Sequence, residues 1–328
     1  MDVPLGRGHH MKTPSVRLCD FVFAATILIG LTDQPPSLSK SSGNNGAAIQ
    51  RFKEYLHTCF HMKDFGRLKY FLGVEVARSP TEIFLCQRKY ALDIITETGL
   101  LGAKPVAIPC EENHRLGSAT GSLLSDPSIY RQLVGRLIYL CFTQPDMAYS
   151  VHILSQFMQN PRIEHWQAAL RVVRYLKGHL GQGILLPRET DLWLYGWCDS
   201  DWASCPLTRK SITGWFFQLG NSPISWKTQK QQTVSASSVE AEYRSMAQIT
   251  KELKWIKDIL FSLYVPHHAS IRLYYDSQAT LHIAKNLALH ERTKHIEVDC
   301  HLVRDEIVHQ RLLPSYVLTQ TQLANLFY

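Results

Sequence analysis

The stretch YGWCDSDWAS, residues 195–204, carries two aspartates, Asp199 and Asp201, within a run of aromatic residues that otherwise reads as a buried strand. Acidic residues are depleted in strands, and burying an unpaired carboxylate is costly. Side chains two positions apart on a strand point to the same face, so both carboxylates would share one face. Either they form a turn with solvated side chains, or a positive partner such as a cation meets them.

The bulk composition is that of a globular chain. With 328 residues we expect about two domains, and with 45% hydrophobic and 19% charged residues either half could bury a core. The net charge of +7 allows a polyanionic partner without establishing one. The eight cysteines form no CxxC pair, which favours reduced, packed thiols over a disulfide frame or a zinc site. We therefore expect an intracellular protein, cytoplasmic or nuclear.

An apolar segment, FVFAATILIGL, occupies residues 21–31. It is too short to span a bilayer. Its length suits the core of a signal peptide, but no clear small-residue cleavage site follows, so we favour a buried or disordered strand-like piece and expect no membrane association. Residues 32–47 are rich in Pro, Ser, Gly and Asn and are typical of a linker.

The chain becomes regular from about residue 48. Periodicity predicts a helix over 49–60, a strand over 68–79, then a turn, and a strand followed by a helix over 82–95. A polar loop over 112–128 and three further helices up to residue 180 follow. In the last of these helices, Arg171, Arg174 and Lys177 lie together on one face. That face is either solvated charge or a rail for a phosphate backbone.

A second block begins near residue 190. It predicts three short strands in a meander, a long helix from Ser237, a fourth strand ending near Asp276, two more helices and a last strand. Ser237 and Glu240 form a capping box at the start of the long helix. Six residues at helical spacing form a continuous apolar stripe along this helix: Met246, Ile249, Leu253, Ile256, Leu260 and Leu263. Strands followed by alternating helices and strands indicate a mixed sheet covered by helices, which is an α/β arrangement.

Three acids of this block fall where a sheet gathers a site. Asp199 lies on the first strand, Glu242 in the first turn of the long helix, and Asp276 at the end of the fourth strand. Converging carboxylates repel one another unless hard cations lie between them, and Mg²⁺ prefers such oxygen ligands. Two such ions can activate a water and stabilise the leaving oxygen of a phosphodiester. Alone, each acid is weak evidence, since an Asp after a strand is commonly a turn residue and Glu242 could complement the helix dipole.

The second block contains the stretches WCDSDWASCPLTRKSITGWFF, LYYDSQATLHIAKN and HERTKHIEVDCHLVRDEI. Together they closely resemble the ribonuclease H domain of copia-type LTR-retrotransposon polyproteins. The first half contains FHMKDFGRLKYFLGVEVARS, QRKYALDIITETGLL and HWQAALRVVRYLKG, which are similar to the C-terminal part of the same family's reverse transcriptase. The resemblance covers roughly residues 42–328.

This resemblance implies a mixed five-stranded sheet with flanking helices, preceded by an α+β region like the thumb and connection of a reverse transcriptase. The domain would cut the RNA strand of an RNA–DNA hybrid with two Mg²⁺ ions, for which Mn²⁺ can substitute. Residue by residue, Asp199, Glu242 and Asp276 match three of the family's four acidic ligands. We interpret Asp201 as a supporting neighbour, because related nucleases often carry serine there.

The sequence departs from the family at two places. The fourth ligand is normally the Asp of a motif resembling ADxxTK, but the matching stretch here is QLANLFY, with Asn325 at that position. An amide oxygen brings no charge, so we expect weaker binding of the second metal and impaired cleavage; the alternative is that loss of this acid is harmless. In the family, the polymerase motif is a YVDD-like turn just before the segment that matches Gly43-Asn44-Asn45. This sequence has no aspartate pair at that place. In the other possible register, Ala25 and Thr26 replace the acids.

Other candidate residues lie beside the proposed site. Arg209, Lys210, Lys227 and Lys230 are either contacts to the hybrid backbone or simple surface charge. His295 and Asp299 are four apart on a helix and could form a metal pair, although such residues more often pack or cap.

We therefore predict three regions: an unrelated or disordered segment with a linker over 1–47, a partial reverse-transcriptase region without its catalytic palm over 48–188, and a ribonuclease H-like domain, truncated at its C-terminus, over 189–328. The predicted function is an impaired ribonuclease H without polymerase activity or a small-molecule substrate. The rivals are a catalytically dead nucleic-acid-binding protein and a pseudogene product.

Overall fold

The computed structural model describes residues 51, 54–55, 57–58, 68–111, 114–262, 265, 267–285 and 297–328. The predictions for the apolar segment, the linker and the polymerase motif lie outside the described residues, as do most of the helix expected at 49–60 and the candidate ligand His295.

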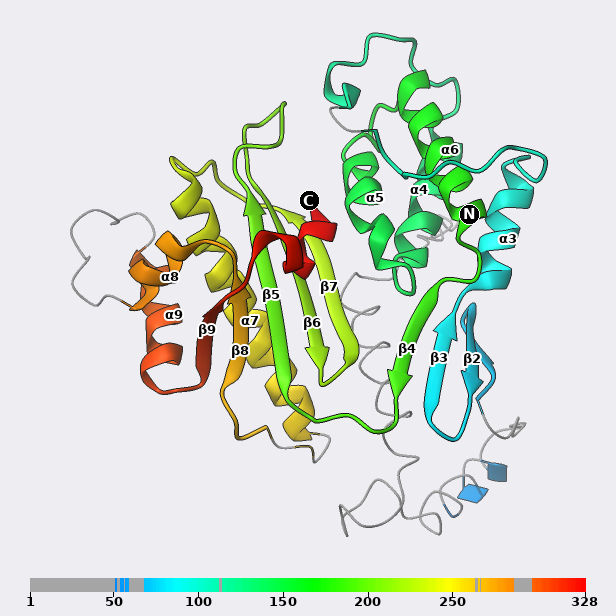
Figure 1. The fold of residues 1–328 in the computed structure, drawn as a ribbon. Helices are drawn as coiled ribbons and strands as arrows, with labels where there is room; N and C mark the ends of the chain where they lie inside the picture. The colour runs from blue at the N-terminus through cyan, green and yellow to red at the C-terminus, as the bar shows by residue number, and fades with distance from the viewer. Residues whose placement is uncertain are drawn as a thin grey trace, which may run out of the picture.

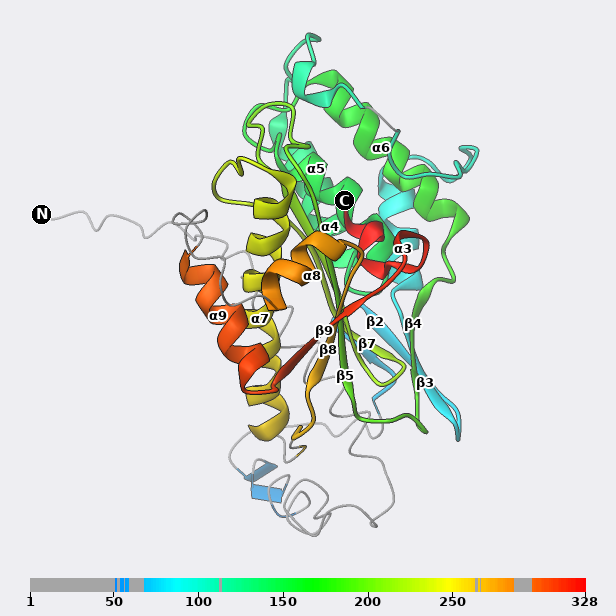
Figure 2. The ribbon, with the colours of Figure 1, turned by 60° about the vertical axis from the view of Figure 1, so that its left-hand side comes forward.

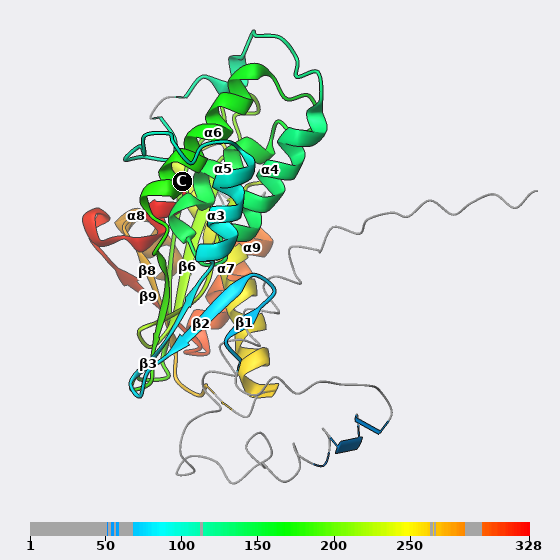
Figure 3. The same cartoon turned by 90° about the vertical axis from the view of Figure 1, so that its right-hand side faces the viewer.

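The upstream part contains a four-stranded antiparallel sheet in the order β1-β2-β3-β4, formed by β1 (Tyr70–Phe71), β2 (Val74–Arg78), β3 (Glu82–Cys86) and β4 (Gly183–Pro187). Figure 1 labels β2, β3 and β4, and Figure 3 labels β1 beside β2. Where we predicted one strand over residues 68–79, a turn at Leu72-Gly73 divides it into β1 and β2. Both turn residues have positive φ, 48° and 86°, which glycine adopts without strain. Strand β4 was not predicted.

Four helices form a second upstream layer (Figure 3): α3 (Arg88–Glu97), α4 (Pro127–Leu140), α5 (Ala148–Ser155) and α6 (Ile163–Gly178). Two short 3₁₀ turns, η1 (Leu116–Ser118) and η2 (Pro145–Met147), lie in their connections. The helices bury a common apolar core that includes Ile94, Leu137, Leu154 and Val173. Asp126 caps α4 by accepting a hydrogen bond from Ser128 N, directly before the proline that begins the helix.

A five-stranded mixed sheet forms the downstream part, in the order β7-β6-β5-β8-β9 (Figure 1). Strands β5 (Leu194–Asp201), β6 (Ile212–Leu219) and β7 (Ser222–Lys230) make the predicted antiparallel meander. Strands β8 (Ile271–Tyr275) and β9 (Leu312–Tyr316) then run parallel to β5. The predicted α/β fold class, a ribonuclease H-like mixed five-stranded sheet with flanking helices, is confirmed.

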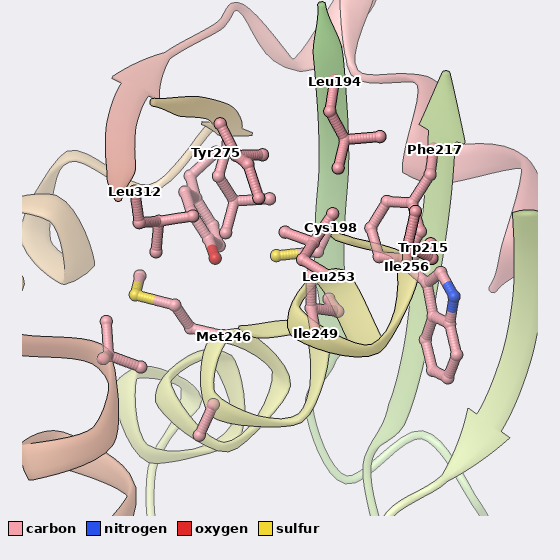
Figure 4. Packing of buried hydrophobic residues seen from close by; sticks show 14 of the residues in the cluster. Leu194, Cys198, Trp215, Phe217, Met246, Ile249, Leu253, Ile256, Tyr275 and Leu312 are labelled. Carbon is pink, nitrogen blue, oxygen red and sulfur yellow. The ribbon is translucent and has the colours of Figure 1, made fainter. Parts of the chain in front are cut away.

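The helices α7 (Ser238–Ser262), α8 (Gln278–Lys285) and α9 (Glu297–Val308) accompany this sheet, and Figure 2 shows α7 and α9 on one side of it. Alternate residues of β5 and β6, among them Cys198 and Phe217, pack against Met246, Ile249 and Leu253 of α7 (Figure 4). Five of the six residues that we placed on the apolar stripe of α7 are buried: Met246, Ile249, Leu253, Ile256 and Leu260. The sixth lies outside the described residues.

The start of α7 differs from a complete capping box. Ser237 Oγ accepts a hydrogen bond from Glu240 N at 3.2 Å, as predicted. The Glu240 carboxylate reaches one residue further back than the box requires, to Ala236 N at 2.8 Å, and also pairs with Arg244 at 2.7 Å. Ser237 therefore caps the backbone N–H of Glu240 as in a capping box, whereas the Glu240 carboxylate caps the N–H of Ala236 in place of that of Ser237.

The upstream and downstream parts contact each other along β7. Trp226 Nε1 donates a hydrogen bond to Cys141 O at 2.9 Å, and Lys230 Nζ donates to Gln156 Oε1 on the residue after α5 at 2.7 Å. Cys86, Cys110, Cys141, Cys198 and Cys205 are free thiols, in keeping with the expected reduced cysteines. No helix in the described part of the chain is long and apolar enough to cross a membrane.

Candidate active site

The three predicted acids are brought to one end of the five-stranded sheet by its topology. Asp199 lies near the end of β5, and Asp276 directly follows β8. Because β5 and β8 are neighbouring parallel strands, their carboxyl ends lie at the same edge of the sheet. Glu242 lies in the second turn of α7, where Ser245 Oγ also contacts Asp199 O at 3.4 Å. Asp199, Glu242 and Asp276 therefore converge.

Each of these carboxylates accepts a hydrogen bond from a hydroxyl group. Thr280 Oγ1 donates to Glu242 Oε2 at 2.8 Å, and Thr319 Oγ1 donates to Asp276 Oδ2 at 2.9 Å. Asp199 has two partners: Ser200 N donates to Oδ1 at 2.6 Å, and the Tyr328 hydroxyl donates to Oδ2. Among the ion pairs of the described residues, none involves any of the three acids.

The electrostatics of the site reflect this lack of positive partners. Burial raises the pKa of Asp199, and the negative charges of Asp276 and Asp201 raise it further, against the lowering effect of the Tyr328 and Ser200 hydrogen bonds. Burial also raises the pKa of Glu242, to which Asp199 and Asp276 add. The pKa of Asp201 is raised by burial. The cluster therefore holds negative charge at an energetic cost that a cation would relieve.

By donor type and charge the cluster fits a divalent cation, since its ligating atoms are all oxygens. As the side chains stand, however, the described residues contain no group of three or more His, Cys, Asp or Glu side chains arranged to hold a metal ion. Both carboxylate oxygens of Asp199 accept hydrogen bonds from protein donors. Asp199, Glu242 and Asp276 could hold a cation once at least one of these contacts is exchanged.

The fourth position, Asn325, is carried by the 3₁₀ turn η5 (Leu323–Phe327), which follows η4 (Thr319–Thr321) and packs on β5 and β6. Buried Gln322 fastens this turn by donating from Nε2 to Cys198 O at 3.1 Å, and Thr228 Oγ1 donates to Phe327 O at 2.8 Å. Asn325 Nδ2 donates to Thr319 O at 3.0 Å, while its Oδ1 lies 2.9 Å from the Tyr328 hydroxyl. One phenol thus joins Asn325 to Asp199.

Gly214 makes room for this arrangement. It is paired with Asp199 across the β5–β6 ladder. A side-chain carbon at this position would lie 2.9 Å from Ala324 O and 3.1 Å from a ring carbon of Tyr328. Any larger residue would therefore push η5 away from the sheet, and with it Asn325 and Tyr328.

Sequence reasoning missed Tyr328, Gly214 and the hydroxyls of Thr280 and Thr319. The motif ADxxTK contained a signal for one of them, because Tyr328 stands where that motif has threonine. The other three are distant in sequence from the acids that they contact or accommodate, and no spacing rule connects them.

The predicted basic face of α6 already has protein partners. Arg171 pairs with Glu111 at 2.8 Å, and Lys177 Nζ donates to Ala103 O at 2.7 Å and to Leu101 O. Arg174 is half-buried on the same helix. The two engaged residues brace the loop that follows α3, so a role as a phosphate rail stays a prediction that would require these contacts to be exchanged.

The four predicted basic residues near the site, Arg209, Lys210, Lys227 and Lys230, differ in their surroundings. Lys230 donates to Gln156, and Lys227 Nζ lies 5.3 Å from the centre of the Trp215 ring. Lys210 is half-buried, whereas Arg209 is exposed in the loop between β5 and β6, with a φ of 53°. Asp299, the described member of the other suggested metal pair, instead lies 3.5 Å from Lys251 Nζ.

The chain is similar to known proteins along most of its length. The family model described as "Reverse transcriptase (RNA-dependent DNA polymerase)" matches residues 26–112. The "Retrovirus-related Pol polyprotein from transposon RE1" of Arabidopsis thaliana is 39% identical over 284 residues, which cover 87% of this chain and 19% of the polyprotein. The "Uncharacterized mitochondrial protein AtMg00810" of the same plant is 38% identical over 214 residues, 65% of this chain and 89% of that protein. Among solved structures, LC11-RNase H1 in complex with RNA/DNA hybrid matches 41% of this chain and 92% of its own, at 9% identity and a TM-score of 0.32.

The mixed sheet, its helices and the acids at its strand ends define a ribonuclease H-like domain, joined here to a reverse-transcriptase region. The chain belongs to the family of copia-type retrotransposon Pol polyproteins. It spans about one fifth of the length of the Arabidopsis Pol polyproteins that it matches. The reverse-transcriptase match begins at residue 26, ahead of our boundary at residue 47, and the three regional boundaries stay predictions.

Proposed function

We propose that this chain is a ribonuclease H-type endoribonuclease that hydrolyses the RNA strand of an RNA–DNA hybrid, weakened by Asn325 and without polymerase activity. The observation that carries the proposal is the convergence of Asp199, Glu242 and Asp276 at one sheet edge with no basic partner in the described ion pairs. Uncompensated carboxylates are costly to bury, and a site that binds cations repays that cost.

Asp199, Glu242 and Asp276 would hold divalent cations, Mg²⁺ or Mn²⁺, with the amide oxygen of Asn325 as a neutral fourth group. When bound, such ions activate a water and stabilise the charge that develops on the phosphate during hydrolysis. The carboxylates keep the ions at the sheet edge, and Thr280 and Thr319 orient two of these carboxylates through their hydroxyls. Because Asn325 lacks the charge of an aspartate, we expect the second ion to bind more weakly.

The RNA–DNA hybrid is the partner that this proposal requires. Exposed Arg209 and half-buried Lys210 lie in the loop that follows the strand of Asp199, where they would contact the phosphate backbone. Lys227, Lys230, Arg171, Arg174 and Lys177 would contribute a broader positive field. A solved relative by fold, LC11-RNase H1, is described in complex with such a hybrid.

A second candidate function is a nucleic-acid-binding protein that does not cleave. The specific observation in its favour is that Asp199 and Asn325 both contact the Tyr328 hydroxyl, so the acids are not arranged as a ready metal centre. An enzyme needs a divalent cation for turnover. The binder would hold hybrid in its absence, with an affinity that falls steeply with salt.

Cleavage of an end-labelled RNA–DNA hybrid by the full chain separates the two functions. We would compare the parent, Asp199→Asn and Asn325→Asp in Mg²⁺ and in Mn²⁺, with folding of each variant checked by circular dichroism. We expect weak cleavage by the parent, none by Asp199→Asn, and a gain of at least about tenfold in Asn325→Asp, since an added charged ligand strengthens cation binding.

No cleavage by folded parent and folded Asn325→Asp would overturn the nuclease and leave hybrid binding as the function. Cleavage that survives Asp199→Asn would show a contaminating enzyme or a different site. Primer extension on a primed template tests the other half of the proposal, and no product is expected from any of the three proteins.

A further inference from the structure

The side chain of Tyr328 lies between two of the proposed cation-binding residues. Its hydroxyl contacts Asp199 Oδ2 and is 2.9 Å from Asn325 Oδ1. We propose that Tyr328 controls cation binding at this site, because its hydroxyl occupies the oxygens that a divalent ion needs and must leave before the ion can bind. This inference rests on the proposed function, and it concerns which residue limits the affinity of the site.

The number of protons shared by Tyr328 and its neighbours shows why the phenol takes the place of a cation. A tyrosine hydroxyl carries one proton, so it can donate to only one of its two neighbours. The amide of Asn325 is oriented by its own bond from Nδ2 to Thr319 O, at 3.0 Å, which leaves Oδ1 facing the phenol. Three oxygens from Asp199, Asn325 and Tyr328 therefore share a single proton. A cation at this place would satisfy the two acceptors better than one proton does.

The packing around Tyr328 holds its ring at the site. The ring lies over Gly214, the one position on β6 that faces Asp199 and leaves space for it. The preceding residue, Phe327, is buried, stacks on Phe216 with ring centres 6.1 Å apart and is held by Thr228 through its carbonyl. Because these anchors belong to Phe327, the Tyr328 side chain can rotate away while η5 stays on the sheet. Figure 1 shows this segment lying across β5 and β6.

Removal of the hydroxyl alone should therefore open the site. In Tyr328→Phe the ring keeps its packing, but Asp199 loses a donor that competes with the cation. A hydrogen bond to a charged group contributes enough that its loss corresponds to about a tenfold or greater change in an equilibrium constant. We expect Tyr328→Phe to bind Mn²⁺ at least about tenfold more tightly than the parent.

The test is a Mn²⁺ titration of the full chain followed by electron paramagnetic resonance, which measures binding and not turnover. Tyr316→Phe is the matched control, because Tyr316 is an exposed tyrosine of β9. Tighter binding in Tyr328→Phe, with unchanged binding in Tyr316→Phe, supports the proposal. Equal or weaker binding in Tyr328→Phe overturns it, and weaker binding would make the phenol a helper of the ion.

Asp199→Asn in the Tyr328→Phe background separates this inference from the proposed function. If Mn²⁺ binding requires Asp199 but is insensitive to Tyr328, the metal site stands and only the control by Tyr328 fails. If neither the parent nor Tyr328→Phe binds Mn²⁺ in an Asp199-dependent manner, both fail. Thermal unfolding of each variant confirms that a loss of binding is not a loss of fold.

A double-mutant cycle adds a second readout. If Tyr328 competes with the ion, the gain in Mn²⁺ affinity from Asn325→Asp should be larger in Tyr328→Phe than in the parent, since residues that share a partner do not act additively. Equal gains in the two backgrounds would show that Tyr328 and position 325 act independently, which contradicts the proposal.

Discussion

The same domain treats two kinds of acid in opposite ways: the buried Glu306, and the half-buried Asp199 and Glu242. Glu306, on α9, has a side chain only 6% exposed, and it pairs with Lys254 at 2.9 Å and with Arg311 at 2.7 Å. These partners lower its pKa to about 2. Asp199 and Glu242 have hydroxyl and amide partners in place of cations, and their pKa values are raised. One fold thus contains a compensated and an uncompensated acid site.

This difference teaches how to recognise function in a domain of this kind. Where an acid serves the structure, this fold supplies cations from two other segments, α7 and the turn before β9, and the acid then ties those segments together. Where three acids converge without such cations, the arrangement costs stability and is retained for another reason. Carboxylates that bind a metal ion are a sufficient reason.

The largest expected effect is on catalysis, and it separates the two groups directly. Glu242→Gln should lower hybrid cleavage by about 100-fold or more, because it removes a charged ligand of the proposed site. Glu306→Gln should leave the specific activity of the folded protein unchanged. The measurement is the cleavage rate of labelled hybrid per folded molecule, with the folded fraction taken from circular dichroism. Equal losses in the two variants would break the comparison.

The second effect is on the free energy of unfolding, and here the expected loss is in the Glu306 variant. Glu306→Gln should lower the free energy of unfolding by about 2 kcal/mol, because the buried acid loses the charge that strengthens its three hydrogen bonds, one from Lys254 and two from Arg311. The exposure of Lys254 and Arg311, 51% and 45%, keeps the expected loss below that of a fully buried pair. Urea unfolding measures it. Glu252→Gln on α7 is the control, since the described ion pairs do not include Glu252.

The stability contribution of Glu306 should disappear in acid. A carboxyl group whose pKa falls from about 4.3 in the unfolded chain contributes its full stability above that value. As the pH falls toward the folded value of about 2, protonation removes the contribution. The difference in unfolding free energy between the parent and Glu306→Gln should therefore shrink between roughly pH 5 and pH 2. A difference that is constant over this range would show that packing, and not charge, stabilises this site.

The sequence alone predicted the part of this comparison that depends on local pattern. The alternation in β5 and the apolar stripe of α7 predicted the core, and the positions of Asp199 and Asp276 near strand ends predicted that they would meet. These features follow from the periods of strands and helices and from the way parallel strands align their ends.

Contacts between distant segments could not be predicted in this way. Nothing near Arg171 indicates that its partner is Glu111, and nothing near Asp199 indicates that its donor is Tyr328, 129 positions later. Strand β4 was missed although the predicted strands β8 and β9 are equally short, because it is recognised by its pairing with β3, which lies far earlier in the sequence. The protein partners of the basic residues could not be predicted for the same reason, because Glu111, which pairs with Arg171, lies on a different segment of the chain.

The smallest effect has an unusual sign and tests whether the acid cluster is costly. In metal-free buffer at neutral pH, Asp199→Asn should raise the free energy of unfolding by about 1 kcal/mol. Because the pKa of Asp199 is raised in the folded state, folding disfavours its ionised form, and the parent loses stability as the pH rises from the unfolded value through the folded one. Asparagine removes that cost and can still accept hydrogen bonds from Ser200 N or the Tyr328 hydroxyl. Glu252→Gln again serves as the control.

The same pair of proteins should reverse their order when Mg²⁺ is added, because an ion that binds only the folded parent stabilises it by mass action. Thermal unfolding with and without Mg²⁺ measures both halves. A destabilised Asp199→Asn in metal-free buffer would mean that the carboxylate is compensated after all, through its hydroxyl and amide donors. The Glu306 and Asp199 sites would then differ in their hydrogen-bond partners but not in the energetic cost of their charge. The physical argument for cation binding at Asp199 would then fail.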